Sequence, residues 1–141
     1  MIEAKLEAPT IDEQIRRCNA FDRVAQEEFT AAMRPALVLG VADIHAFSPY
    51  ASGTLDSSVS SAIKYTSGEN VRGVMTASAT GGNGFPYGYA LDASNKYRYA
   101  GTNKRTKGWL KGVTRRKRGE IMALFAAAVG RIVNRLAVNN G

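Results

Sequence analysis

The sequence predicts one α+β domain, with a long kinked N-terminal helix and a C-terminal helix packed on a small, mainly antiparallel sheet of three to four strands. Apolar residues recur at helical spacing over residues 11–33 and 121–136. Between residues 59 and 92 they alternate with polar residues, as in strands that bury one face. A chain of 141 residues is long enough to bury a core of its own. We therefore treat residues 1–141 as a single domain.

The first helix is expected to follow an N-terminal arm, residues 1–9. Thr10 and Glu13 have the spacing of a capping box, which satisfies backbone N–H groups at a helix start. Cys18 lies on the apolar stripe that follows and is predicted to be a core residue. That stripe consists of Ile11, Ile15, Cys18, Ala25, Phe29, Ala32 and Met33.

A proline then interrupts the helical pattern. Pro35 lacks an N–H group and disfavours helix at the residue before it, so a kink is expected there. A straight helix over residues 11–47 would be about 55 Å long, whereas a compact globule of this size is about 35–40 Å across. We therefore expect either that the helix bends at Pro35 or that one end projects and is covered by a neighbouring subunit. Residues 36–47 are apolar on nearly all sides, as in a helix that is buried on most faces. The candidate oligomer contacts are Leu37, Leu39, Val41 and Ile44.

A turn-rich joint connects this helix to the sheet. Pro49 should stop the helix, and Gly53 permits the turn. Leu55 and Val59 are expected to anchor the joint in the core. Strands are predicted in the four segments that follow, at residues 59–65, 71–78, 87–92 and 97–100, the last of which also reads as a loop.

Charge is distributed unevenly along the chain. Residues 1–95 contain seven Lys/Arg and eleven Asp/Glu, a net charge of −4, whereas residues 96–141 contain twelve Lys/Arg and one Glu, a net charge of +11. The basic, loop-rich segment 96–118 therefore suits a polyanion, an acidic protein surface or solvent. Its candidate contacts with a partner or a DNA channel are Lys104, Arg105, Lys107, Lys111, Arg115, Arg116, Lys117 and Arg118. A helix that began near Thr114 would place the last four at its positive end, which the helix dipole disfavours.

No catalytic, cofactor or metal site is predicted. His45 is the only histidine and has no Cys or His at ligand spacing. A single cysteine allows no internal disulfide, which fits assembly in the cytosol. The N-terminus has no signal-peptide pattern, and no apolar run is expected to reach the roughly 20 residues that span a membrane. These observations argue against an enzyme and against a membrane partner.

Aromatic residues lie close to the basic segment. Such residues can stack on single-stranded bases, or they can pack on a sheet face or a subunit contact, which is the interpretation we favour. The residues are Phe85, Tyr87, Tyr89, Tyr97, Tyr99 and Trp109.

The joint carries a family resemblance. Pro49-x-x-Ser52-Gly53-x-Leu55-x-x-Ser58-Val59, between a long helix and the strands, resembles the P-x-x-T-G-x-L-x-x-S-I signature of the neck and tail-completion proteins of tailed bacteriophages. Ser replaces the Thr and Val the Ile. The family's Y-A-x-x-x-E-x-G motif is matched only at Tyr89-Ala90, and its P-F-L only loosely by Gly108-Trp109-Leu110.

The resemblance implies a structural virion protein that forms a ring in the head-to-tail connector, with six subunits as the first expectation and twelve as the second. Such a ring would join a portal, adaptor or stopper complex to the tail and surround the double-stranded DNA. It would be assembled in the host cytoplasm and reside in the neck of the virion. The alternative is a sequence-independent nucleic-acid-binding protein that uses segment 96–118.

Overall fold

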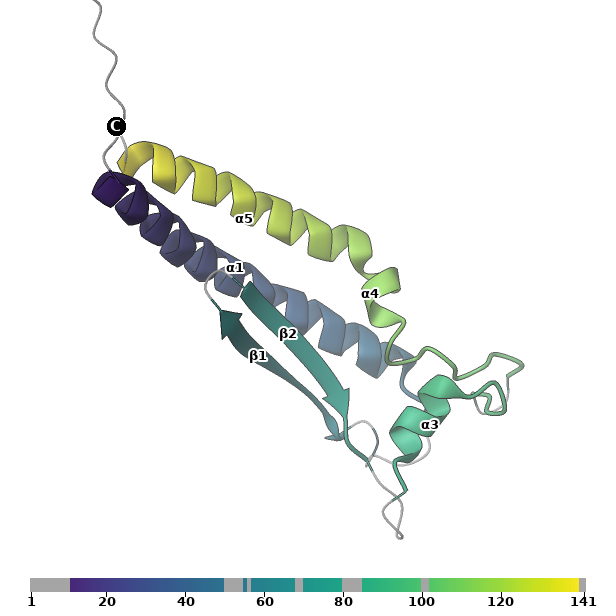
Figure 1. Ribbon diagram of the computed structural model, residues 1–141. Helices are drawn as coiled ribbons and strands as arrows, with labels where there is room; N and C mark the ends of the chain where they lie inside the picture. Colours follow the sequence, from purple (N-terminus) through teal and green to yellow (C-terminus); the bar gives the residue numbers. More distant parts are fainter. Residues whose placement is uncertain are drawn as a thin grey trace, which may run out of the picture.

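The computed structural model describes residues 11–49, 55, 57–67, 70–79, 85–99 and 102–139. Helix α1 (Ile11–Phe47) is the central element, and helix α5 (Arg118–Asn139) lies antiparallel along one side of it (Figure 1). Strands β1 (Val59–Ser67) and β2 (Asn70–Ala77) form a hairpin on another side of α1. The short helices α3 (Tyr87–Ala93) and α4 (Val113–Arg116) lie near the C-terminal end of α1. The chain is therefore α+β, with two long helices and a small antiparallel sheet.

Helix α1 continues through Pro35 without a break. The kink predicted at Pro35 therefore does not divide this segment into two helices. Pro35 itself is exposed. The buried residues Ala32 and Ala36 lie on either side of it, one turn apart, and share one face. Packing of this face on both sides of the proline offsets the hydrogen bond that the proline cannot donate.

The two long helices pack through a small apolar cluster. Val24, Ala25 and Ile132 are buried together, and Phe29 and Leu136 pack against them. Next to this cluster, Glu28 accepts a hydrogen bond from Arg131 Nε at 2.7 Å and another from Arg135 Nη1 at 3.2 Å. Hydrogen bonding from Arg131 is the main cause that lowers the pKa of Glu28 below its ordinary value.

The sheet contains two strands in the described part of the chain, not three or four. Its antiparallel register pairs Ile63 with Gly73, and Gly73 lies against Met33 and Leu37 of α1. The hydroxyls of Ser60 and Thr76 lie 2.9 Å apart and are bonded across the strands. The hairpin thus packs one face on α1.

The predicted third strand is wrong, because residues 87–93 form helix α3. Gly88 and Asp92, one helical turn apart, are both buried. A Cβ at Gly88 would lie 3.1 Å from Leu55 Cδ1, and the Gly88 carbonyl accepts a hydrogen bond from Trp109 Nε1 at 3.1 Å. In the predicted strand, alternation placed Tyr89 on the inward face, but Tyr89 is 42% exposed. The predicted fourth strand is represented by an isolated bridge between residues 98 and 105.

A second apolar core holds the joint and the end of α1 together. Leu55 is fully buried in it, Val59 packs against it, and Pro49 is buried nearby. Gly53 lies outside the described residues. The core consists of Ile44, Leu55, Ala77, Ala79, Trp109, Leu110 and Val113. The joint therefore meets the hairpin, α1 and the segment before α4 in one cluster.

The N-terminal end of α1 is largely open. None of residues 11–23 is buried, and Cys18 is exposed, so its predicted place in the core is wrong. The reason is geometric, since the innermost contacts of α5 with α1 start only at Val24. The helical period of this segment was read correctly, but its apolar stripe is not buried by the described residues.

Helix α5 is more apolar than the sequence analysis allowed. The 21 residues Arg118–Val138 are long and apolar enough to cross a membrane, judged by length and composition alone, and 11% of this stretch is buried in the subunit. The expectation that no run approaches that length was therefore wrong. Two of its charges, Arg131 and Arg135, are used in ion pairs with α1.

Gly112 and Gly130 allow a matched test of the close packing around Gly112. A Cβ at Gly112 would lie 2.4 Å from the Gly108 carbonyl oxygen, which is backbone and has little freedom to move, whereas a Cβ at Gly130 in α5 would meet nothing within 4 Å. We expect Gly112→Ala to lower the free energy of unfolding by about 1–3 kcal/mol. Gly130→Ala should raise it by about 0.5–1 kcal/mol, because alanine favours helix. Urea denaturation measures both, and equal effects would contradict the packing around Gly112.

Candidate interaction surfaces

The basic segment is fixed to the fold through helix α3. Asp92 is 3% exposed, and its Oδ1 accepts hydrogen bonds from the backbone N–H groups of Leu110 at 2.8 Å and Lys111 at 3.0 Å. Thr106 Oγ1 donates to the Leu91 carbonyl at 2.9 Å, and the Gly108 N–H donates to the Asp92 carbonyl at 2.9 Å. A buried carboxylate with two backbone donors holds a turn firmly. The part of the basic segment from Thr106 onward is therefore attached to α3 by hydrogen bonds.

Arg116 ties this segment to α1. Its Nε donates to Asp43 Oδ2 at 2.8 Å, and its Nη1 and Nη2 donate to the carbonyls of Gly108 at 3.0 Å and Trp109 at 2.8 Å. The guanidinium carbon lies 4.1 Å from the centre of the Phe47 ring, within cation–π range. The side chain of Arg116 is 18% exposed and that of Asp43 is 4% exposed. We call these contacts the Arg116 clamp.

A tyrosine on the basic segment adds to this attachment. The Tyr99 hydroxyl donates a hydrogen bond to the carbonyl of Phe47, the last residue of α1. Burial raises the pKa of the Tyr99 phenol above its ordinary value. The segment therefore contacts the end of α1 at two separate points.

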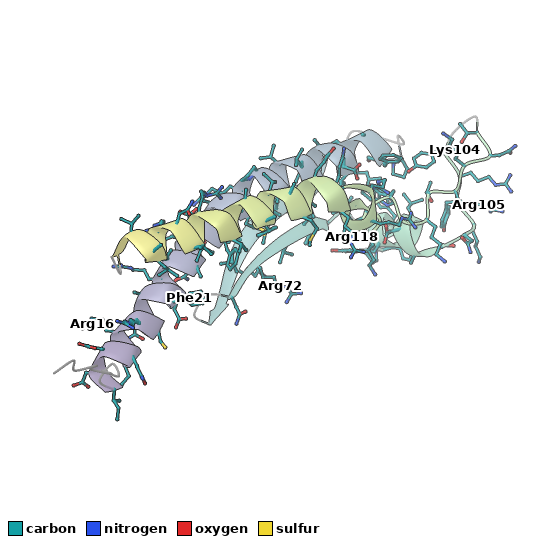
Figure 2. All side chains as sticks on the ribbon, turned by 90° about the horizontal axis from the view of Figure 1, so that it is seen from above. Arg16, Phe21, Arg72, Lys104, Arg105 and Arg118 are labelled. Carbon is teal, nitrogen blue, oxygen red and sulfur yellow. The ribbon has the colours of Figure 1, made fainter. Side chains whose placement is uncertain are left out.

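The clamp changes the interpretation of the basic candidates. Arg116 is a structural residue rather than a contact for DNA or a partner, and Lys117 Nζ lies 3.4 Å from Glu120 Oε2 in the first turn of α5. Figure 2 shows Lys104 and Arg105 on the loop that projects from the end of the molecule, and Arg118 at the start of α5. Six of the eight candidates have exposed side chains: Lys104, Arg105, Lys107, Lys111, Arg115 and Arg118.

The helix boundary relieves the expected conflict with the helix dipole. Arg115 and Arg116 lie in the last turn of α4, where the dipole favours cations. Helix α5 begins at Arg118 and has Glu120 in its first turn, where the dipole favours an acid. The run of four cations is therefore divided between two helix ends of opposite sign.

Two of the four predicted oligomer contacts are buried inside the subunit. Ile44 is 0% exposed and belongs to the second core, and Leu37 is 7% exposed. The prediction for these two is wrong, because the hairpin and the segment before α4 cover that side of α1. Leu39 and Val41 are half-buried, and the neighbouring Val38 is 70% exposed.

An open apolar surface lies on α5 instead. Sequence periodicity placed Val129 and Val133 on the buried stripe, but they are 49% and 59% exposed, and Met122 is 58% exposed. Met122, Ala126, Val129 and Val133 follow one another at intervals of four, three and four residues, so they share one flank of the helix. We call these four residues the α5 stripe. Sequence alone could not separate it from the buried face, since α5 is apolar on nearly all sides.

A groove adjoins the stripe at the junction of α4 and α5. It has a volume of about 420 Å³ and a mostly apolar lining. Thr114, Arg115, Arg118, Ile121 and Met122 line it, and Met122 also belongs to the α5 stripe. The groove thus places two guanidinium groups beside an apolar floor.

The described residues contain no cluster of three or more His, Cys, Asp or Glu side chains that could hold a metal ion. Trp109 is 1% exposed, so it cannot stack on a base. Tyr89 and Tyr97 are each 42% exposed and remain available for contacts.

A scan against protein-family models, a search of curated proteins and a search of solved structures each find no match to this chain.

Removing the clamp should destabilise the fold far more than removing a neighbouring cation. Arg116→Ala leaves the buried Asp43 carboxylate without its ion pair, so we expect a loss of about 3–5 kcal/mol in the free energy of unfolding. Lys107→Ala, which removes a charge of the same sign from an exposed side chain, should change it by no more than about 0.5 kcal/mol. Thermal or urea denaturation measures both variants. Similar losses in the two would show that the clamp contributes nothing particular.

Proposed function

We propose that the chain is a structural, ring-forming subunit of a bacteriophage-type neck, joining a portal or stopper complex to the tail and surrounding the DNA channel. The observation that carries the proposal is the α5 stripe. Its valines and methionine are 49–59% exposed on a helix that the Arg131 and Arg135 ion pairs already hold against α1. A second copy that covers the stripe would remove this apolar surface from water. The resemblance of the joint Pro49–Val59 supplies the neck setting.

The placement of the two open surfaces suits a ring. The α5 stripe runs along the side of an elongated subunit, and the loop with Lys104 and Arg105 projects from one end (Figure 2). Copies that contact side by side through two different patches close into a ring when the rotation between them closes. An end loop in such a ring is free to meet either an adjoining acidic ring or DNA phosphates. We favour the protein contact, because DNA that must move through a channel should not be held tightly.

A charge placed on the stripe should prevent assembly without unfolding the subunit. Val133→Glu puts a carboxylate on the α5 stripe, and Asn134→Glu puts the same carboxylate on an exposed position about 100° around the helix. Burying an unpaired charge costs several kcal/mol, so Val133→Glu should abolish the oligomer, whereas Asn134→Glu should not. Light scattering and negative-stain imaging at high protein concentration measure the oligomer, and circular dichroism checks the fold.

Closed rings in the unmodified protein and in Asn134→Glu, with folded monomers in Val133→Glu, would support the proposal. A protein that stays monomeric both in solution and in assembled particles would overturn it. Binding of the unmodified protein to liposomes through α5 would also overturn it, because α5 would then belong in a lipid bilayer.

A second candidate function is sequence-independent binding of nucleic acid through the basic segment. The observation that favours it is the set of exposed cations on the projecting loop, Lys104, Arg105 and Lys107. Phosphate contacts of this kind need no base-specific groups.

This second function predicts strongly salt-dependent binding to duplex DNA. Neutralising three phosphates releases their counterions. The logarithm of the binding constant should therefore fall with the logarithm of the salt concentration with a slope of about −2.7 or steeper. The triple variant Lys104→Glu/Arg105→Glu/Lys107→Glu should lose binding. The control Lys64→Glu/Arg72→Glu, which reverses two exposed charges on the hairpin, should keep it. Negligible affinity at about 150 mM salt, where non-specific binding still has dissociation constants of about 10⁻⁴–10⁻⁶ M, would exclude this function.

A further inference from the structure

We infer that the groove at the junction of α4 and α5 receives the N-terminal arm, residues 1–9, of a second copy of this chain. The inference rests on the part of the proposed function that requires self-association. It adds a defined contact, in which a segment of one subunit crosses to its neighbour.

The groove has the chemistry of a site for an apolar and acidic segment. Ile121 and Met122 form an apolar floor, and Arg115 and Arg118 stand beside it with exposed side chains. Within the part of the chain that the structure describes, neither arginine is ion-paired with an acid, in contrast to Arg116, Arg131 and Arg135. A fitting occupant would therefore bring carboxylates and apolar side chains together.

The arm has this composition. Its sequence Met1-Ile2-Glu3-Ala4-Lys5-Leu6-Glu7-Ala8-Pro9 contains the pair apolar–acid twice, at Ile2-Glu3 and at Leu6-Glu7. The two carboxylates match the two guanidinium groups, which bind carboxylates in forked hydrogen bonds. The two aliphatic side chains match the floor. Nucleic acid would satisfy the arginines but would leave the apolar floor without a partner.

The Leu6-Glu7 pair of the same chain is too far from the groove to reach it. The groove lies along α1 between the levels of Phe29 and Asp43, because Phe125 packs on Phe29 and Arg116 pairs with Asp43. From Ile11 to Phe29 the helix axis already rises about 27 Å at about 1.5 Å per residue. Leu6 is five residues before Ile11 and can extend at most about 18 Å from it. The Leu6-Glu7 pair in the groove must therefore come from another copy.

The open apolar surface agrees with this arrangement. Met122 belongs both to the groove and to the α5 stripe, so an arm seated in the groove continues onto the stripe that a neighbouring copy would cover. An arm from one copy in the groove of the next is a head-to-tail contact, which repeats around a ring.

A charge swap in the full-length chain tests the inference. Glu3→Lys/Glu7→Lys and Arg115→Glu/Arg118→Glu should each weaken self-association by at least about tenfold, since two attractive ion pairs become repulsive. Combining all four changes in one chain should restore association to near the starting value. The control Lys64→Glu/Arg72→Glu alters two exposed charges on the hairpin and should have no such effect. Analytical ultracentrifugation measures each equilibrium. Failure of the fourfold variant to recover would overturn the inference.

Disulfide trapping shows which copy supplies the arm. In a Cys18→Ser background, a chain with Leu6→Cys and a larger, tagged chain with Met122→Cys should oxidise to a mixed dimer. Ala127→Cys, exposed on the same helix but outside the groove, should give far less. A chain that carries both Leu6→Cys and Met122→Cys and forms only an intramolecular disulfide would overturn the inference.

The outcomes separate this inference from the proposed function. Closed rings that persist after charge reversal in the arm overturn the inference and leave the ring intact. Mixed dimers through positions 6 and 122 without closed rings overturn the neck proposal and support the inference.

Discussion

The fold at the end of α1 depends on one guanidinium group. Arg116 neutralises Asp43 in a site where the carboxylate is 4% exposed, and it also binds the carbonyls of Gly108 and Trp109. Arg116 and Asp43 are 73 residues apart in sequence, so this contact joins the basic segment to a distant part of the chain in α1. With it in place, Trp109, Leu110 and Val113 are held over Ile44 and Leu55. The basic segment thereby becomes part of the domain, and its exposed cations are presented on a fixed base.

Ion pairs also decide which face of α5 remains open. Glu27 and Glu28 of α1 bind Arg131 and Arg135, which are the charged residues within the apolar part of α5. These two charges are thus turned toward α1. The α5 stripe, by contrast, has no charge of its own and is exposed to solvent. A surface of this kind in a single subunit is typical of proteins that associate.

Local periodicity was enough to predict the long helices and the hairpin. Spacing of 3.6 residues placed α1 and α5, and alternation placed β1 and β2. Residues 87–92 were assigned to a strand because Tyr87, Tyr89 and Leu91 alternate. Their helix depends on contacts of Gly88 with Leu55 and Trp109, which no local pattern reveals. The role of Arg116 was hidden for the same reason, since its partner Asp43 is remote in sequence and its neighbours are also basic.

Hydrogen exchange tests the central claim, that the clamp joins the basic segment and α1 into one cooperative unit. The backbone N–H groups of Leu110 and Lys111, which bind Asp92, should exchange as slowly as those of α1 around Ile44, with the same dependence on denaturant. This result means that both open only when the whole domain unfolds. Exchange of Leu110 and Lys111 at a much lower opening free energy than Ile44 would contradict the account, because the segment would then detach from α1 independently.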